Sequence, residues 1–234
     1  MFGPLLSTNN SPKGPNLKYL ESLEFDLSGN RLSLAVPNGN WKQLPNLQGD
    51  IELQTNLYDD SQFNRFKKND NDTSKIIFDR FYNYSTFMHP NLGTLHLIMQ
   101  IVRIIKPNIN LFSAEQLREE VKARVESICE ESNKDQDDEF LLKQPSKNYQ
   151  LESLGCEEFL TYQINHYSSF DPYYAIPLTS EHFITFGFHY SVNMKRDGEP
   201  PWYLMARNLE KQIMQSVKLE LTETFQQEKE AANG

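Results

Sequence analysis

Cysteine is nearly absent from this chain. The 234 residues include only Cys129 and Cys156, and neither lies in a CxxC motif or has a histidine beside it at metal-ligand spacing. A scaffold held together by several disulfides is therefore excluded, and no zinc site is indicated. The sequence leaves open whether the two cysteines pair with each other.

Motifs that bind phosphate or present a nucleophile are also missing. Only 10 glycines are present, and the chain contains no GxGxxG, no Walker-type loop and no GxSxG. These absences argue against a dinucleotide-binding fold, a kinase and a hydrolase built on a nucleophile elbow. We expect no cofactor and no bound metal.

The sequence has no long hydrophobic run. Its most apolar stretch, residues 95–105, is interrupted by His96, Gln100 and Arg103, whereas a membrane-spanning helix needs roughly 20 apolar residues. Residues 1–16 lack the basic and apolar regions of a signal peptide. We therefore expect a cytoplasmic protein if Met1 is the natural start. If a signal peptide has been removed, we expect a periplasmic or envelope-attached protein with a lipid anchor upstream.

Basic residues are outnumbered by acidic ones. The chain has 23 Lys and Arg against 32 Asp and Glu, which gives a net charge of −9, and such a field repels the phosphates of a nucleic acid. Residues 130–139 hold six acids and one Lys, hence −5 of the −9. This stretch predicts contact with a basic partner protein through Asp135, Asp137, Asp138 and Glu139, because complementary charge speeds association. A solvated loop is the simpler alternative.

Large aromatic side chains supply what the low apolar content lacks. There are 15 Phe, 11 Tyr and 2 Trp, enough to fill a core. Alternating apolar residues predict a hairpin over residues 23–36 and further strands, of which residues 182–192 place Ile184, Phe186, Phe188, Tyr190 and Val192 on one face. Apolar residues at helical spacing predict two amphipathic helices, residues 113–132, opened by a capping box of Ser113 and Gln116, and residues 201–217.

These patterns predict an α+β fold in which an antiparallel β-sheet is flanked by the two amphipathic helices. We expect residues 1–20 to be a flexible leader, residues 21–225 a single domain and residues 226–234 a frayed tail. A short last strand is expected near residues 218–222.

The segment from His166 to Asp171 contains the residue types of a Ser/His/Asp site. This leads to the hypothesis of a small hydrolase that uses His166 or His189 with Asp171, and it requires these side chains to converge. A turn with Asp171-Pro172 as a simple breaker is the favoured interpretation. His182 and His189 are seven residues apart on one strand, so they should face opposite ways. His96 and His189 could meet only on neighbouring strands.

Aromatic residues are concentrated in the loop predicted over residues 167–174. Tyr167, Phe170, Tyr173 and Tyr174 form a second candidate contact surface for a partner protein, since such residues are enriched at interface centres. Packing within the core is the alternative.

The order of elements resembles that of the PsbP/DcrB-like family. The likeness rests on a first hairpin ending in Pro37 and Trp41, several antiparallel strands, one central helix, the strong strand 182–192 and a last helix running into residues 216–219. The resemblance implies an antiparallel sheet flanked by helices and a non-catalytic role in binding another protein, and it assigns no site residue. We therefore expect a bacterial accessory protein, such as an envelope lipoprotein domain, a secretion chaperone or a toxin-immunity protein. The small hydrolase is the alternative, and a small-ligand carrier would need an apolar cavity.

Overall fold

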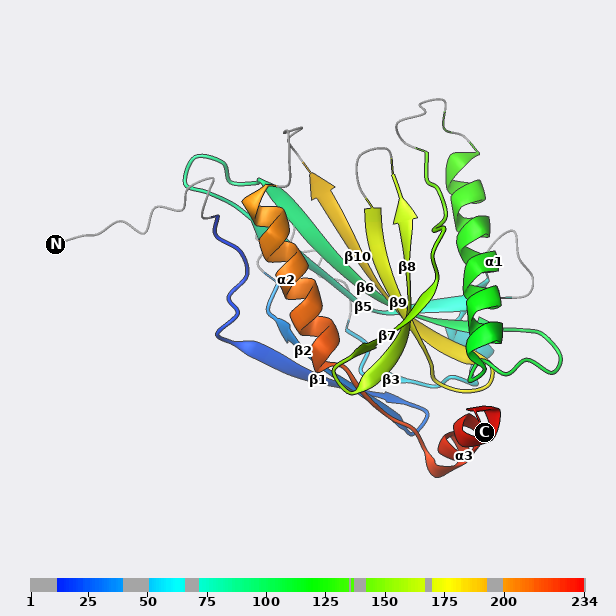
Figure 1. Ribbon diagram of the computed structural model, residues 1–234. Coiled ribbons are helices and arrows are strands. Elements are labelled where there is room, and N and C mark those ends of the chain that lie inside the picture. The colour runs from blue at the N-terminus through cyan, green and yellow to red at the C-terminus, as the bar shows by residue number, and fades with distance from the viewer. Residues whose placement is uncertain are drawn as a thin grey trace.

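Antiparallel hairpins make up most of the computed structural model, which describes residues 12–39, 51–65, 72–134, 136, 142–166, 170–192 and 200–233 (Figure 1). A seven-stranded sheet has the order β4-β5-β6-β10-β9-β8-β7 and a four-stranded sheet the order β11-β2-β1-β3. The larger sheet contains β4 (Asn64–Arg65), β5 (Asp72–Tyr84), β6 (Gly93–Ile104), β7 (Gln150–Leu154), β8 (Glu157–Asn165), β9 (Phe170–Pro177) and β10 (His182–Val192). The smaller sheet contains β1 (Leu20–Leu27), β2 (Asn30–Pro37), β3 (Gln54–Thr55) and β11 (Lys218–Glu220). The helices are α1 (Ala114–Asn133), α2 (Pro201–Ser216), α3 (Glu223–Asn233) and the 3₁₀ turn η2 (Asp60–Gln62).

The β1–β2 hairpin shows how local sequence sets the first pairing. Ser28 and Gly29 have φ angles of 57° and 92°, the left-handed conformation that a two-residue hairpin turn requires. The Asp26 carboxylate accepts a hydrogen bond from the Gly29 N–H at 2.8 Å. Leu23, Phe25 and Leu27 are buried as their alternation predicts, so the hairpin is confirmed.

The two faces of the large sheet are covered by different layers. The β1–β2 hairpin and α2 pack over one face, in a core that includes Phe78, Leu97 and Phe186. Helix α1 packs over the other face, in a core that includes Val102 and Phe183. The α+β class with antiparallel pairing is confirmed, but the strands divide into two sheets where one was expected, because β1, β2 and β11 pair only among themselves and with β3.

Three local predictions differ from the structure. Residues 170–174, expected in a loop, belong to β9, and Pro172 is tolerated there because the β9–β10 ladder covers only Tyr173–Pro177, so its missing N–H falls beyond that ladder. The expected frayed tail is helical from residue 226 to 233, since α3 is rich in Glu, Gln and Ala, which favour helix. The alternation of Ile51, Leu53, Thr55 and Leu57 predicts a strand over residues 51–57, but the structure has only the two-residue β3 there, which pairs in parallel with β1.

Helix α1 begins where predicted, with a different cap. Ser113 is the N-cap but makes no side-chain cap hydrogen bond. The Gln116 side chain instead accepts from the Asn110 N–H at 2.8 Å, and the Asn110 side chain accepts from the Phe112 N–H. In a capping box the Gln116 side chain would accept from the Ser113 N–H, but here it accepts from the Asn110 N–H in the preceding loop. Trp41 lies outside the described residues.

Candidate functional site

A buried carboxylate joins three strands at one end of the large sheet. Asp171 on β9 accepts a hydrogen bond at 2.9 Å from His166 Nε2, just past the end of β8, and another at 2.9 Å from His189 Nδ1 on β10. Its second oxygen accepts from the Tyr190 N–H at 3.2 Å. The three residues named in the hydrolase hypothesis thus converge, because β8 and β9 form a hairpin and β10 lies beside β9.

The electrostatics of this cluster hold Asp171 in its ionised form. Burial raises the pKa of Asp171, but the hydrogen bonds from His166 and His189 and their charge outweigh burial, so its pKa lies well below the usual range. The carboxylate is only 9% exposed. It can therefore orient both imidazoles over a wide range of pH.

Tyr173 completes a row that has the order of a catalytic triad. The Tyr173 hydroxyl lies 3.3 Å from His189 Nε2, so carboxylate, Nδ1, Nε2 and hydroxyl follow one another as in Ser/His/Asp enzymes. Burial raises the pKa of the Tyr173 hydroxyl, however, and neighbouring Tyr162 and Asp171 raise it further. A hydroxyl that holds its proton this firmly is a hydrogen-bond donor and a poor nucleophile.

A second imidazole–carboxylate pair lies beside the first. His96 on β6 is directly opposite His189 in the strand register, with ring centroids 5.7 Å apart. The His96 Nε2 bonds the Asp79 carboxylate, and the Phe81 ring stacks on His96 at 3.7 Å. The meeting of His96 and His189 was one of the open possibilities in the sequence. Asp79 was missed because a bulge between Ile76 and Phe78 sets which β5 residues face α1, and a bulge leaves no clear sequence signal.

Tyrosine rings continue from Tyr173 along the α1 side of the sheet, and each contacts the next. Tyr149 stacks on Tyr162 and Tyr162 on Tyr173, with centroids 5.7 and 5.2 Å apart. Gly187 makes this possible, since a Cβ at that position would come within 2.6 Å of the Tyr173 ring. In the part of the chain that is described, no group of three or more His, Cys, Asp and Glu residues is arranged to hold a metal ion.

The predicted aromatic contact surface is divided between two faces. Tyr173 points to the α1 side of β9, while Tyr174 is buried on the α2 side, where its hydroxyl donates to the Glu210 carboxylate. Phe170 lies under the Arg207 guanidinium, 5.5 Å from it. Tyr167 is outside the described residues. The structure therefore does not bring Phe170, Tyr173 and Tyr174 to one surface.

Glu210 is the centre of a buried polar cluster under α2. It accepts from Tyr174, from Tyr190 and, at 2.7 Å, from Arg207. Burial raises the pKa of Glu210, opposed by the Arg207 charge and the two tyrosine hydroxyls. With three donors satisfied inside the fold, Glu210 anchors α2 to the sheet.

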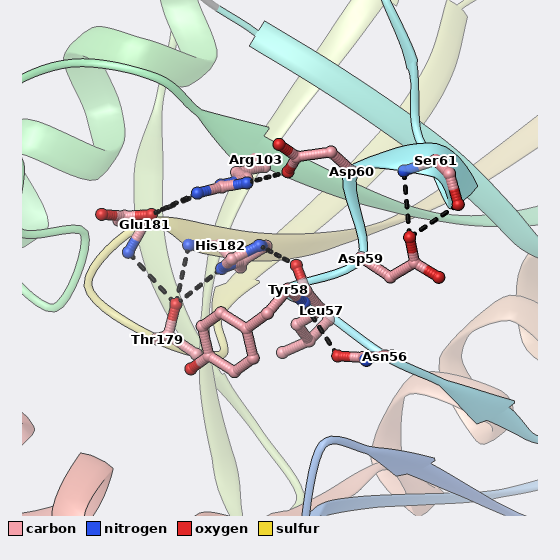
Figure 2. Close-up of polar contacts among 10 residues, drawn as sticks. All are labelled: Asn56, Leu57, Tyr58, Asp59, Asp60, Ser61, Arg103, Thr179, Glu181 and His182. Atoms are coloured by element: carbon pink, nitrogen blue, oxygen red, sulfur yellow. Dashed lines mark hydrogen bonds and ion pairs between the residues drawn. The ribbon is translucent and has the colours of Figure 1, made fainter.

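His182 anchors the loop that contains η2 (Figure 2). Its Nε2–H donates to the Leu57 carbonyl at 2.9 Å, and its Nδ1 lies 2.9 Å from the Thr179 hydroxyl. Burial lowers the pKa of His182 to about 4, assisted by the nearby Arg103 charge. The ring is therefore neutral at neutral pH, and it lies on the opposite face of β10 from His189, as predicted.

The acidic surface predicted around residues 130–139 is only partly described. Asp135, Asp137, Asp138 and Glu139 lie outside the described residues. The helix that leads to them carries exposed glutamates at positions 115, 119, 126 and 130, which at 100° per residue fall within an arc of about 60°. Exposed Arg118 and Lys122 lie beside one edge of this arc. This row was not singled out in the sequence, although its spacing was the available signal.

The cysteines are free, with Cys129 buried and Cys156 exposed. Within the described residues, no helix combines the length and the apolar character that a membrane crossing requires.

Comparison with known proteins finds no relative. No family model matches the chain. No curated protein and no solved structure matches it either.

Proposed function

We propose that this chain is a non-catalytic bacterial accessory protein that binds a basic partner protein through the outer face of α1 and the acidic stretch that follows it. The observation that supports the proposal best is the row of exposed glutamates on α1. The helix lies at the outer side of the large sheet (Figure 1), and its apolar side is occupied by the core, with Leu117, Val121 and Val125 buried.

The titratable groups of the candidate site are hydrogen-bonded to other groups of the protein, and this supports a non-catalytic role. Asp171 is engaged by two histidines and a backbone N–H, and both nitrogens of His189 have partners. The histidine of a catalytic triad also has both nitrogens engaged, but its Nε2 contacts a reactive hydroxyl, whereas burial raises the pKa of the Tyr173 hydroxyl and leaves it a poor nucleophile. These contacts instead tie β8, β9 and β10 together, which is what a rigid binding scaffold needs.

The negative charge on α1 indicates which kind of partner would bind there. Glu120 is paired with Lys106 at 2.6 Å, and Glu131 with Lys134 at 2.6 Å, while Glu119 and Glu126 stay exposed. Complementary charge raises the association rate and makes binding sensitive to salt. A partner with a lysine- or arginine-rich face fits this surface. Membership of the PsbP/DcrB-like family stays a prediction that agrees with such a role.

The test begins with capture of partners by the tagged full chain from an extract of the source organism at low salt. The captured protein is then purified and its affinity measured by calorimetry at increasing salt. We expect Glu119→Lys with Glu126→Lys to weaken binding about tenfold, which is 1.4 kcal/mol, and added salt to weaken it further. Glu24→Lys, an exposed position on β1, is the control and should leave the affinity nearly unchanged.

Failure to capture any protein, or an affinity that does not respond to the α1 substitutions and to salt, would contradict the proposal. An affinity lost equally in the Glu24→Lys control would point to net charge alone and not to α1.

A second candidate function, a small hydrolase, is favoured by one observation, the convergence of His166 and His189 on Asp171. It predicts turnover of p-nitrophenyl acetate above the buffer rate, lost in both Asp171→Asn and His189→Gln. We expect no turnover from the wild-type chain. Turnover that both variants abolish, with folding intact by circular dichroism, would replace the binding function with this one.

A further inference from the structure

Three segments far apart in sequence meet at one end of the molecule. They are residues 12–20, residues 85–92 between β5 and β6, and residues 200–206 at the start of α2 (Figure 1). Lys13 and Ser85 exchange two backbone hydrogen bonds of 2.7 and 2.9 Å. Trp202 on α2 packs against Tyr84 with centroids 5.8 Å apart. We call these three segments together the apolar end.

The apolar end exposes large hydrophobic side chains at an unusual density. Phe87 is 77% exposed and Met88 80%, and they are consecutive at the tip of the hairpin. Of the 13 large hydrophobic residues exposed in the described part of the chain, seven belong to the apolar end: Leu17, Tyr19, Leu20, Phe87, Met88, Leu204 and Met205. Gly14 lies beside the Tyr84 ring and Met205, so the three segments adjoin, and large hydrophobic side chains exposed on adjoining segments are typical of an interaction surface.

The charge of the apolar end is opposite to that of the whole chain. The protein has 32 acidic residues, yet none falls in these three segments, which contain Lys13 and Lys18. The next acidic residue after the first segment, Glu21, is paired with Arg80 at 3.1 Å. Asp197 and Glu199 precede the third segment in the sequence, so the charge that favours an anionic surface comes from Lys13 and Lys18.

We propose that the apolar end rests on a lipid bilayer that contains anionic headgroups. In this orientation the exposed Phe87 and Met88 side chains enter the acyl boundary, Tyr19 suits the interface between headgroups and water, and the two lysines meet lipid phosphates. This goes beyond the proposed function, because the acidic row of α1 is a separate surface. An anionic bilayer repels the acidic parts of the chain, so its charge favours binding in the orientation that brings the apolar end to the lipid.

A lipid surface fits the observations better than a protein does. The exposed apolar side chains come from a hairpin tip, a helix start and an extended segment, accompanied by lysine and without a single acid. This combination of apolar, aromatic and basic residues is typical of segments that lie in a membrane interface. Recognition of a protein by charge is already accounted for by α1.

The experiment measures co-sedimentation of the full 234-residue chain with two sets of vesicles, phosphatidylcholine alone and phosphatidylcholine mixed with phosphatidylglycerol. We expect stronger binding to the mixed vesicles. Phe87→Ser with Met88→Ser should lower the partition coefficient on them about tenfold, because two apolar side chains no longer leave water. Lys13→Glu with Lys18→Glu should lower binding to mixed vesicles only.

The matched control is Ile105→Ser. Ile105 is 45% exposed and follows the opposite end of β6 from the hairpin tip, so its substitution should leave vesicle binding unchanged. Circular dichroism verifies that every variant is folded.

Two results would overturn the proposal. One is a wild-type chain that stays in the supernatant with both kinds of vesicle. The other is a Phe87→Ser, Met88→Ser variant that binds vesicles like wild type but loses the purified partner protein, which would make the apolar end a protein-docking surface. The first result leaves the test of α1 unaffected, since that test uses other residues and no lipid. The second result would extend the partner's binding surface beyond α1, and the Glu119→Lys, Glu126→Lys variant then shows whether α1 also contributes.

Discussion

Acidification should destabilise the fold through His182. In the folded chain burial lowers the pKa of this imidazole from 6.5 to about 4, while in the unfolded chain it protonates near its ordinary value. Between these two values the unfolded state binds more protons than the folded state, so the free energy of unfolding falls as pH falls. The stability is fully present above about pH 6.5 and is lost progressively towards pH 4.

The size of the effect follows from the shift. A difference of about 2.5 pKa units corresponds to about 3 kcal/mol once both states are protonated, at 1.36 kcal/mol per unit, and most of it is lost by about pH 4.5. This is a large part of the roughly 5–15 kcal/mol of a typical domain. The physical reason is that both ring nitrogens have partners inside the protein, Nδ1 the Thr179 hydroxyl and Nε2 the Leu57 carbonyl. A second proton, on Nδ1, would have no acceptor unless the Thr179 hydroxyl turned.

Urea denaturation followed by circular dichroism at a series of pH values measures the effect. His182→Gln retains one donor and one acceptor but does not titrate, so its stability should depend on pH less steeply than that of the wild type, by about 2 to 3 kcal/mol between pH 7 and 4.5. The other groups titrate equally in both proteins and cancel. Equal pH dependence in wild type and variant would refute the assignment of a neutral, buried His182.

Further substitutions test the packing. Gly187→Ala should cost about 1–3 kcal/mol in urea denaturation, because its Cβ would meet the Tyr173 ring at 2.6 Å. Arg124→Leu should cost about 3–5 kcal/mol, since the buried pair with Asp72, 2.7 Å apart, would lose its cation, and Arg124→Leu with Asp72→Leu should recover most of that loss. Phe87→Ser should leave the urea midpoint nearly unchanged, because the side chain is 77% exposed and exposed positions contribute little.

Periodicity predicted the elements whose faces differ most in burial. The predicted strand over residues 182–192 has the same limits as β10. The reason is that Ile184, Phe186 and Phe188 face a core that excludes water, while Thr185 and Gly187 lie on the other face. The helix over residues 201–217 was found within one residue for the same reason. Such patterns report burial on one side of an element, and they carry no information about which elements become neighbours.

What could not be predicted depends on contacts between segments distant in sequence. The smaller sheet is completed by β11, which pairs with β2 about 185 residues earlier in the chain. Strand β7 is exposed along almost its whole length, so it has no alternation to detect. Pro172 indicated a turn, and only its place beyond the β9–β10 ladder explains why a strand accepts it.

At the candidate site, too, the sequence predicted local features but not the contacts between strands. The spacing of seven residues within one strand predicted that His182 and His189 lie on opposite faces. The convergence of His166 and His189 on Asp171 needed the register of three strands, and the pairing of His96 with Asp79 needed the bulge in β5. Side chains that meet across strands leave no local pattern, so the sequence could name these residues without showing that they meet.

The distribution of charge relates the two proposed surfaces. The acidic row of α1 and the lysine-bearing apolar end share no residue and belong to different elements, and the large sheet lies between α1 on one face and α2 on the other. Effects at separate, non-contacting surfaces add. A chain with both Glu119→Lys and Phe87→Ser should therefore lose partner affinity and vesicle binding each by the amount that its single substitution causes. If the two losses depend on each other, one bound surface must alter the other through the sheet, and the cluster around Asp171, which ties three of its strands together, is the first place to look for that coupling.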